Sequence, residues 1–140
     1  MKQYQENDYA LAKMLLERVK TKKERSPRIT YGECADQLTA ILGRKVNAHL
    51  GLSVPLGHVC EMCYECGVPF LTAIVVYKND LQNSKTGEGF YKIACKLRKE
   101  YTSMDPVEAW GAEYYSVQKW KDWSSLEAYL ASHKSSKLRF

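Results

Sequence analysis

The sequence predicts a single α+β domain that is mainly helical and carries a small β-sheet. Apolar residues recur at helical spacing along most of the chain, and capping residues mark several helix starts. One short β-branched run, Leu71 to Tyr77, has the character of a buried strand. The chain has 140 residues, of which 45% are hydrophobic and 26% charged, so it can bury a core of its own.

The first helix is predicted from about Glu6 to Lys20, with Asn7 or Asp8 as its N-cap. A basic connection overlaps its end, because six lysines or arginines lie between Arg18 and Arg28 against the single acid Glu24. This connection is either a solvated helix end, where cations favour the negative pole of the dipole, or a segment that contacts phosphate. The first helix and the basic connection together form the N-terminal part of the predicted domain, residues 1–27.

The second helix is predicted to begin at Thr30. Thr30 and Glu33 form a T-x-x-E capping box, in which each side chain satisfies a backbone N–H of the other residue. Leu38, Ile41 and Leu42 give the apolar face of this helix, and Gly43 follows where a left-handed C-cap is expected.

The third helix is predicted to have Ser53 or Val54 as its N-cap and Pro55 in its first turn. Its inner face is predicted to consist of Leu56, Val59, Cys60 and Cys63, and Gly67 ends it. Together with the strand that follows, these two helices form the central part of the predicted domain.

Two polar loops carry cations that suit contact with phosphate. One joins the central helices, and the other, residues 78–89, follows the strand and is as long as many functional loops. Ordinary surface loops have the same composition, so both interpretations stay open. The candidate residues are Arg44, Lys45, Asn47 and His49 in the first loop and Lys78 and Lys85 in the second.

Additional helices are predicted over residues 90–134, before a basic tail at 135–140. One runs from Phe90 to about Tyr101, one starts at the Asp105 D-P-x-E motif, and a short one starts at Ser124. The segment from Tyr114 to Trp120 alternates in polarity as well as it fits a helix, so a second strand is an alternative there.

The cysteines are predicted to be packing residues. Cys60, Cys63 and Cys66 have the spacing C-x-x-C-x-x-C inside one helix, whereas zinc usually requires four ligands from two knuckles. Buried thiols explain this spacing well, and we expect neither a metal nor another cofactor. A nucleophile pair between His58 and Cys34 is an alternative that the sequence leaves open.

No catalytic motif is present, so we do not expect an enzyme. The chain has no phosphate-binding loop, no G-x-S-x-G and no H-E-x-x-H. It also has no apolar run of membrane-spanning length, and its five cysteines are an odd number. Residues 1–9 contain no apolar stretch, so we expect no signal peptide. We therefore expect a cytoplasmic protein without a membrane partner.

Aromatic residues gather in the C-terminal quarter of the chain. They either close the core or form a patch for a protein partner, because tyrosine and tryptophan are enriched in interfaces. The residues concerned are Trp110, Tyr114, Tyr115, Trp120, Trp123 and Tyr129.

Residues 28–89 contain a set of short motifs in a recognisable order. They are Thr30-Tyr31-Gly32-Glu33, the predicted helix Pro55–Cys66, Val68-Pro69, Ala73-Ile74-Val75-Val76 and Gly87-Glu88-Gly89. This segment resembles the DNA-binding domain of the alkylguanine-DNA alkyltransferases and the alkyltransferase-like proteins. The resemblance implies a winged helix-turn-helix-like core in which Tyr31 lies close to the DNA backbone.

The segment departs from that family at the active site. The family's P-C-H-R is absent, since Pro69 is followed by Phe70, Leu71 and Thr72, so alkyl transfer is not expected. The third helix also lacks an arginine that could take the place of an extruded base, so base flipping is not expected.

Two functions follow as hypotheses. The first is a small non-enzymatic protein that binds double-stranded DNA through a winged-helix-like surface. The second is a protein-interaction module that uses loop 78–89 and the C-terminal aromatics. The motif arrangement is similar to that of small proteins from phages and defence islands. One form of the second hypothesis is therefore an inhibitor or adaptor that acts on a host defence protein. The predicted DNA-binding residues are Arg28, Thr30, Tyr31, Arg44, Lys45, Asn47, His49, Lys78 and Lys85.

Overall fold

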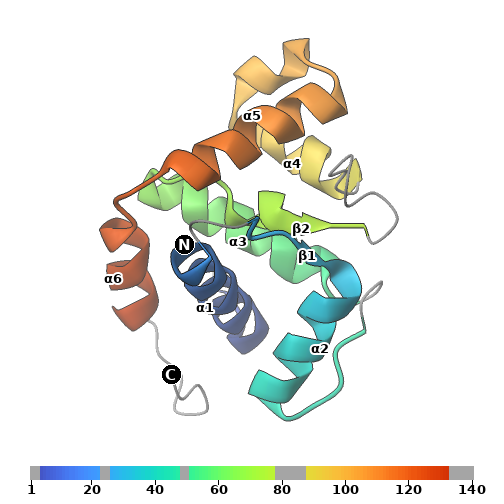
Figure 1. Ribbon diagram of the computed structural model, residues 1–140, viewed down its shortest axis with the longest axis vertical. Coiled ribbons are helices and arrows are strands. Elements are labelled where there is room, and N and C mark those ends of the chain that lie inside the picture. Colours follow the sequence, from blue (N-terminus) through green and yellow to red (C-terminus); the bar gives the residue numbers. More distant parts are fainter. Residues whose placement is uncertain (1–3, 23–25, 48–50, 78–87, 133–140) are drawn as a thin grey trace.

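The computed structural model describes residues 4–22, 26–47, 51–77 and 88–132 (Figure 1). Within these ranges the chain forms six α-helices, two 3-10 helices and a two-stranded parallel sheet, which confirms the mainly helical α+β class. None of these helices combines the length and apolar character needed to cross a membrane. The elements are α1 Glu6–Thr21, β1 Ile29–Thr30, α2 Tyr31–Leu42, α3 Ser53–Cys66, η1 Leu71–Ile74, β2 Val75–Val76, α4 Glu88–Leu97, η3 Lys99–Ser103, α5 Pro106–Lys119 and α6 Ser124–Ser132.

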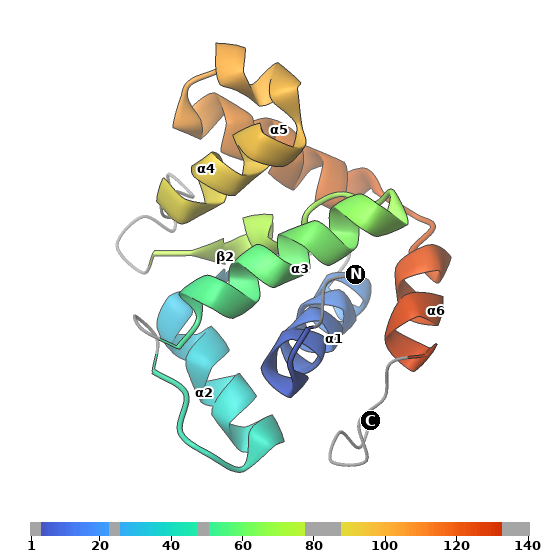
Figure 2. The ribbon, with the colours of Figure 1, turned by 180° about the vertical axis from the view of Figure 1, so that it is seen from behind.

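Helix α3 is the centre of the fold. It packs most extensively against α1 and α4, and it also contacts η1 and α6. Figures 1 and 2 show it crossing the middle of the molecule, with α1 and α6 on one side and α4 and α5 on the other. Helix α2 packs mainly against α1 and the two strands. The close pairing of α2 with α3 that a helix-turn-helix-like core implies is therefore not a main contact of the fold.

The apolar face of α2 differs from the prediction at one position. Ile41 was predicted to point inward, but its side chain is 39% exposed. The buried face is set by Cys34 and Leu38, and a helical repeat of four carries it on to Leu42, which is partly buried against the core. Ile41 is therefore rotated away from the core by about a quarter of a turn.

Four predicted helix boundaries are confirmed. The Glu33 N–H donates to the Thr30 hydroxyl at 3.1 Å, and the Thr30 N–H donates to the Glu33 carboxylate at 3.2 Å. Gly43 and Gly67 end α2 and α3 with φ of 73° and 71°, the left-handed region that glycine adopts without strain. The Asp105 carboxylate accepts from the Glu108 N–H at 2.9 Å, ahead of Pro106 in the first turn of α5.

Two predicted N-caps are wrong. The N-cap of α1 is Gln5, and Asp8 lies three residues further on, where its carboxylate accepts from the Gln5 N–H at 2.6 Å. The N-cap of α3 is Leu52, which is 1% exposed, and its side chain makes no capping hydrogen bond. Burial of Leu52, rather than a polar side chain, fixes where α3 starts.

The predicted strand from Leu71 to Tyr77 is only partly a strand. Residues Leu71–Ile74 form the 3-10 helix η1, and only Val75 and Val76 pair, in parallel, with Ile29 and Thr30 of β1. Instead of a neighbouring strand, side chains of α5 satisfy the buried backbone: Trp110 Nε1 donates to the Ala73 carbonyl at 2.7 Å. The β-branched composition of this segment therefore indicated that it is buried, but not that it forms a strand along its whole length.

The described C-terminal part contains only helices, joined by short non-helical segments. The helix predicted from Phe90 to Tyr101 divides into α4 and η3, because Arg98 adopts an extended backbone with φ −123° and ψ 99°. This break turns Tyr101 inward, where it is 6% exposed. The alternative strand over Tyr114 to Trp120 is wrong, since all but the last of these residues belong to α5.

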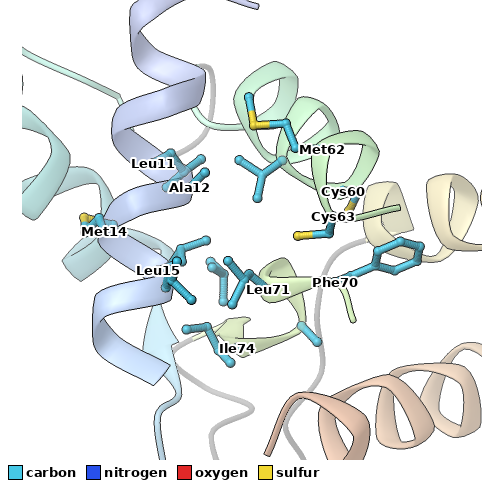
Figure 3. Close-up of a cluster of buried hydrophobic side chains, with 14 of the residues drawn as sticks. Leu11, Ala12, Met14, Leu15, Cys60, Met62, Cys63, Phe70, Leu71 and Ile74 are labelled. Atoms are coloured by element: carbon cyan, nitrogen blue, oxygen red, sulfur yellow. The ribbon is translucent and has the colours of Figure 1, made fainter. Parts of the chain in front are cut away.

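The cysteines of α3 line the core. Figure 3 shows Cys60 and Cys63 near Leu71 and Phe70, across from Leu11 and Leu15 of α1. The Cys60 thiol lies 2.9 Å from the buried Thr72 hydroxyl, so one hydrogen bond joins the two groups. Burial raises the pKa of the Cys60 thiol to about 12.

The thiols should react in two classes. Cys34, Cys60 and Cys63 are buried, whereas Cys66 and Cys95 are partly exposed. We expect iodoacetamide at pH 8 to modify only Cys66 and Cys95 in the native protein and all five after unfolding, because burial hinders both ionisation and access. Mass spectrometry of the digested protein measures this, and early labelling of Cys60 in the folded chain would contradict it.

Candidate functional site

The predicted DNA-binding residues lie at both ends of α2. Arg28, Thr30 and Tyr31 lie at its start, and Arg44, Lys45 and Asn47 follow its end. A helix of 12 residues separates the two groups by about 18 Å. His49, Lys78 and Lys85 lie outside the described residues.

Several of these side chains have partners within the chain. Thr30 is 7% exposed, and its hydroxyl accepts the capping hydrogen bond from the Glu33 N–H. Arg28 Nε donates to the Ser26 hydroxyl at 2.7 Å. The Arg44 guanidinium donates to the Asn7 side chain and lies 3.8 Å from the Glu6 carboxylate, so it joins α2 to the start of α1.

The starts of three helices lie on one side of the molecule. Helices α3 and α4 run in the same direction, because Gly57 lies beside Ile93 and Tyr64 beside Arg98. Figures 1 and 2 show that the starts of α2, α3 and α4 lie on the side where β2 ends. Tyr31 and the 44% exposed Tyr77 meet at this edge, with ring centroids 5.0 Å apart.

A pocket of about 360 Å³ lies at the opposite ends of α3 and α4. It is bounded by the loop after α3, by η3 and by the second half of α5. We call it the aromatic pocket. The lining residues that matter for its chemistry are Arg98, Glu100, Tyr101, Glu113, Tyr115, Lys119 and Trp120, beside the loop Gly67-Val68-Pro69.

Glu113 forms the base of the aromatic pocket. It is 2% exposed, and its carboxylate accepts hydrogen bonds from the Phe70 N–H at 2.6 Å and from the Tyr101 hydroxyl. Burial raises the pKa of Tyr101, and the bond to Glu113 raises it further, so the phenol keeps the proton that it donates. These bonds hold the loop after α3, η3 and α5 together.

Arg98 balances the charge of Glu113. Its Nε lies 3.7 Å from the Glu113 carboxylate, and its terminal nitrogen donates to the Val68 carbonyl at 3.2 Å. The guanidinium also lies over the Phe70 ring, 4.6 Å from the ring centroid. The buried part of the pocket is therefore close to neutral.

Aromatic side chains form the exposed rim. Tyr115 is 60% exposed and Trp120 38% exposed. The Trp120 Nε1 donates to the Asp122 carbonyl at 2.7 Å, which fixes the ring, and the Lys119 ammonium lies 5.3 Å from the centroid of the Tyr115 ring. Trp120 and Tyr115 thus present open aromatic surface beside a polar base.

The other C-terminal aromatics belong to the core. Trp110 is 8% exposed and stacks with Tyr114 at a centroid distance of 4.9 Å, and Trp123 is 3% exposed. The predicted aromatic patch is therefore wrong for Trp123 and is limited to Tyr115 and Trp120. Trp123 is buried directly before α6, which begins at Ser124 and buries Leu126 against the core.

Sequence reasoning missed Arg98 and Glu113. A signal for Glu113 was present, since it lies three residues after Trp110 and four before Val117 on the inward face of a helix. A carboxylate at such a position requires buried partners. Nothing in the local sequence identified Tyr101 and Phe70 as those partners, because they come from other elements.

The alternative nucleophile pair is not assembled as such. His58 Nδ1 lies 2.8 Å from the Asp8 carboxylate, which ties α3 to the start of α1. Cys34 is buried, and burial raises the pKa of its thiol to about 12, so it is held as a thiol. Across the described ranges no three His, Cys, Asp or Glu side chains gather as metal ligands would.

Comparison with known proteins adds no assignment. No protein-family model, curated protein or solved structure matches this chain. The function is therefore argued from the two surfaces themselves.

Removing Glu113 should destabilise the fold strongly. We expect Glu113→Ala to lower the free energy of unfolding by about 3–5 kcal/mol, because it leaves Arg98 unpaired and two buried donors without an acceptor. Gln118→Ala, at an exposed position of the same helix, should change it by no more than about 0.5 kcal/mol. Urea denaturation measures both, and equal stability of the two variants would contradict the role of Glu113.

Proposed function

We propose that this chain is a non-enzymatic protein-interaction module that binds a partner protein at the aromatic pocket. The observation that carries the proposal is the exposure of Tyr115 and Trp120, 60% and 38%, at the mouth of a pocket with a buried polar base. Aromatic side chains dominate the binding energy of protein interfaces when they flank a pocket that excludes water.

The rigidity of the pocket supports this role. Tyr115 lies two residues after Glu113 in α5, and Trp120 is the C-cap of that helix. Glu113 is anchored by its hydrogen bonds to Phe70 and Tyr101. A rim held in place before binding loses little conformational entropy when a partner docks. The proposal assigns no reaction to Glu113, because its carboxylate oxygens already accept hydrogen bonds from the chain.

The class of partner comes from the sequence resemblance alone. The motif arrangement is similar to that of small proteins from phages and defence islands, so a host defence protein is the first partner to test. In that setting the chain acts as an inhibitor or an adaptor. Loop 78–89, predicted as a second part of the interface, lies outside the described residues except for its last two.

Truncating the rim should weaken partner capture strongly. We expect Tyr115→Ala with Trp120→Ala to weaken binding about 30-fold or more, the effect of losing an interface hot spot of about 2 kcal/mol. The measurement is quantitative capture from a nuclease-treated cell lysate, followed by titration of the captured protein.

The matched control is Val54→Ala with Val107→Ala, since these side chains are 62% and 50% exposed but lie outside the pocket. It should capture the same proteins as the wild type. Identical capture by the rim variant and the wild type would refute the proposal.

DNA binding is the second candidate, and one observation favours it. The starts of α2, α3 and α4 lie on one side, where Tyr31 and Tyr77 meet, and Arg28 lies three residues ahead of Tyr31 in the sequence. Helix starts carry the positive pole of the dipole, so this edge attracts phosphate. Glu33 already occupies the start of α2, which limits that attraction.

The salt dependence of duplex binding tests this candidate. Arg28→Ala with Lys45→Ala removes one cation at each end of α2. The slope of log K against log[salt] should flatten by about 1 if the duplex contacts only the helix starts and by about 2 if it also reaches the loop after α2. Lys99→Ala with Lys121→Ala, exposed positions away from α2, should leave the slope unchanged. Absence of duplex binding by the wild type at about 50 mM salt and micromolar concentration would rule the candidate out.

A further inference from the structure

We propose that the aromatic pocket binds an arginine side chain of the partner protein, an inference that rests on the proposed function. The pocket volume of about 360 Å³ is at the lower end of the range for ligand pockets, roughly 300–1,000 Å³. It therefore suits one long side chain rather than an extended segment. Four features of its lining select a cation over an anion or an apolar group.

The backbone makes the pocket favourable to positive charge. Three of its lining residues mark helix ends: Gly67 caps α3, Arg98 follows α4, and Lys119 is the last residue of α5. The end of a helix carries the negative pole of its dipole, which attracts cations within the last turn. Three such ends at one pocket add to each other.

One carboxylate of the pocket is available to an incoming cation. Glu113 is committed to Arg98, Tyr101 and Phe70 at the base. Glu100 is exposed, and no cation among the described residues forms an ion pair with it. A guanidinium entering the pocket can pair with Glu100 without breaking a bond that holds the fold.

The chain already places a cation of its own on the rim. The Lys119 ammonium lies 5.3 Å from the centroid of the Tyr115 ring, within the range of a cation–π contact. Lys119 is exposed and sits on a flexible stem, so a partner's cation can displace it. Lys119 thus occupies the position that the arginine would take.

The aromatic surfaces favour arginine over lysine. The Trp120 ring is oriented by its hydrogen bond to the Asp122 carbonyl, and Tyr115 is 60% exposed. A planar guanidinium stacks on such rings and still donates to a carboxylate, which a compact ammonium does less well. Arg98 shows the same behaviour inside this chain, where its guanidinium lies over Phe70.

A titration with small probes tests the inference directly. The indole N–H signal of Trp120, followed by ¹⁵N nuclear magnetic resonance, reports on the rim, and the buried Trp110 and Trp123 serve as internal references. N-acetyl-arginine amide should shift the Trp120 signal. N-acetyl-citrulline amide, which has nearly the same shape without the charge, should bind about 3- to 10-fold more weakly.

Variants separate competition from structural effects. Lys119→Ala should bind N-acetyl-arginine amide about 2- to 5-fold more tightly, because it removes the internal competitor. Lys121→Ala, an exposed lysine that does not line the pocket, should have no effect. Glu100→Gln and Tyr115→Leu should each weaken binding by about 2- to 5-fold.

Three results would overturn the inference. They are equal shifts with the arginine and citrulline probes, a stronger response to N-acetyl-glutamate amide, and unchanged or weaker arginine binding by Lys119→Ala. None of these results contradicts the proposed function if the variant with Tyr115→Ala and Trp120→Ala still fails to capture partners. Conversely, arginine binding by a chain whose rim variant captures the same proteins would refute the proposed function and leave the chemistry of the pocket in place.

Discussion

The buried backbone from Phe70 to Val76 imposes the constraint on which the rest of the structure depends. All seven residues are buried, yet each carries polar backbone groups that cannot remain without partners. Glu113 accepts from the Phe70 N–H, Trp110 donates to the Ala73 carbonyl, and β1 pairs with the last two residues. The position of α5 and the pairing of β1 both follow from this single requirement.

The same requirement produces the aromatic pocket. Helix α5 must lie with Glu113 over the loop after α3, and this brings its last turn beside Gly67 and Arg98. Tyr101 reaches Glu113 only because the chain bends at Arg98 after α4. The exposed Tyr115 and Trp120 are thus positioned by a network of buried hydrogen bonds. The pocket surface is a consequence of the hydrogen bonds that the buried backbone requires.

Local features of the sequence were predictable, and distant ones were not. The capping box of Thr30, the glycine ends Gly43 and Gly67 and the start at Asp105 depend on residues within four positions of each other, so sequence spacing identifies them. The 3-10 geometry of Leu71–Ile74 depends on Trp110 and Glu113, about 40 residues away. Spacing predicted the apolar face of α3 but not that α1, α4 and α6 would surround it.

The central position of α3 limits how residues 28–89, which resemble a DNA-binding domain, could meet a duplex. A helix that enters a DNA groove must expose one side, and it usually presents cations there. Helix α3 contains no lysine or arginine, and α1, α4, η1 and α6 pack around it. Any duplex would therefore meet helix starts rather than the side of α3.

The edge formed by the helix starts and the aromatic pocket lie at opposite ends of α3. They are about 21 Å apart along its 14 residues, so neither surface blocks the other. Helices α3 and α4 direct their positive ends to the edge and their negative ends to the pocket, so the helix dipoles favour opposite charges at the two proposed surfaces.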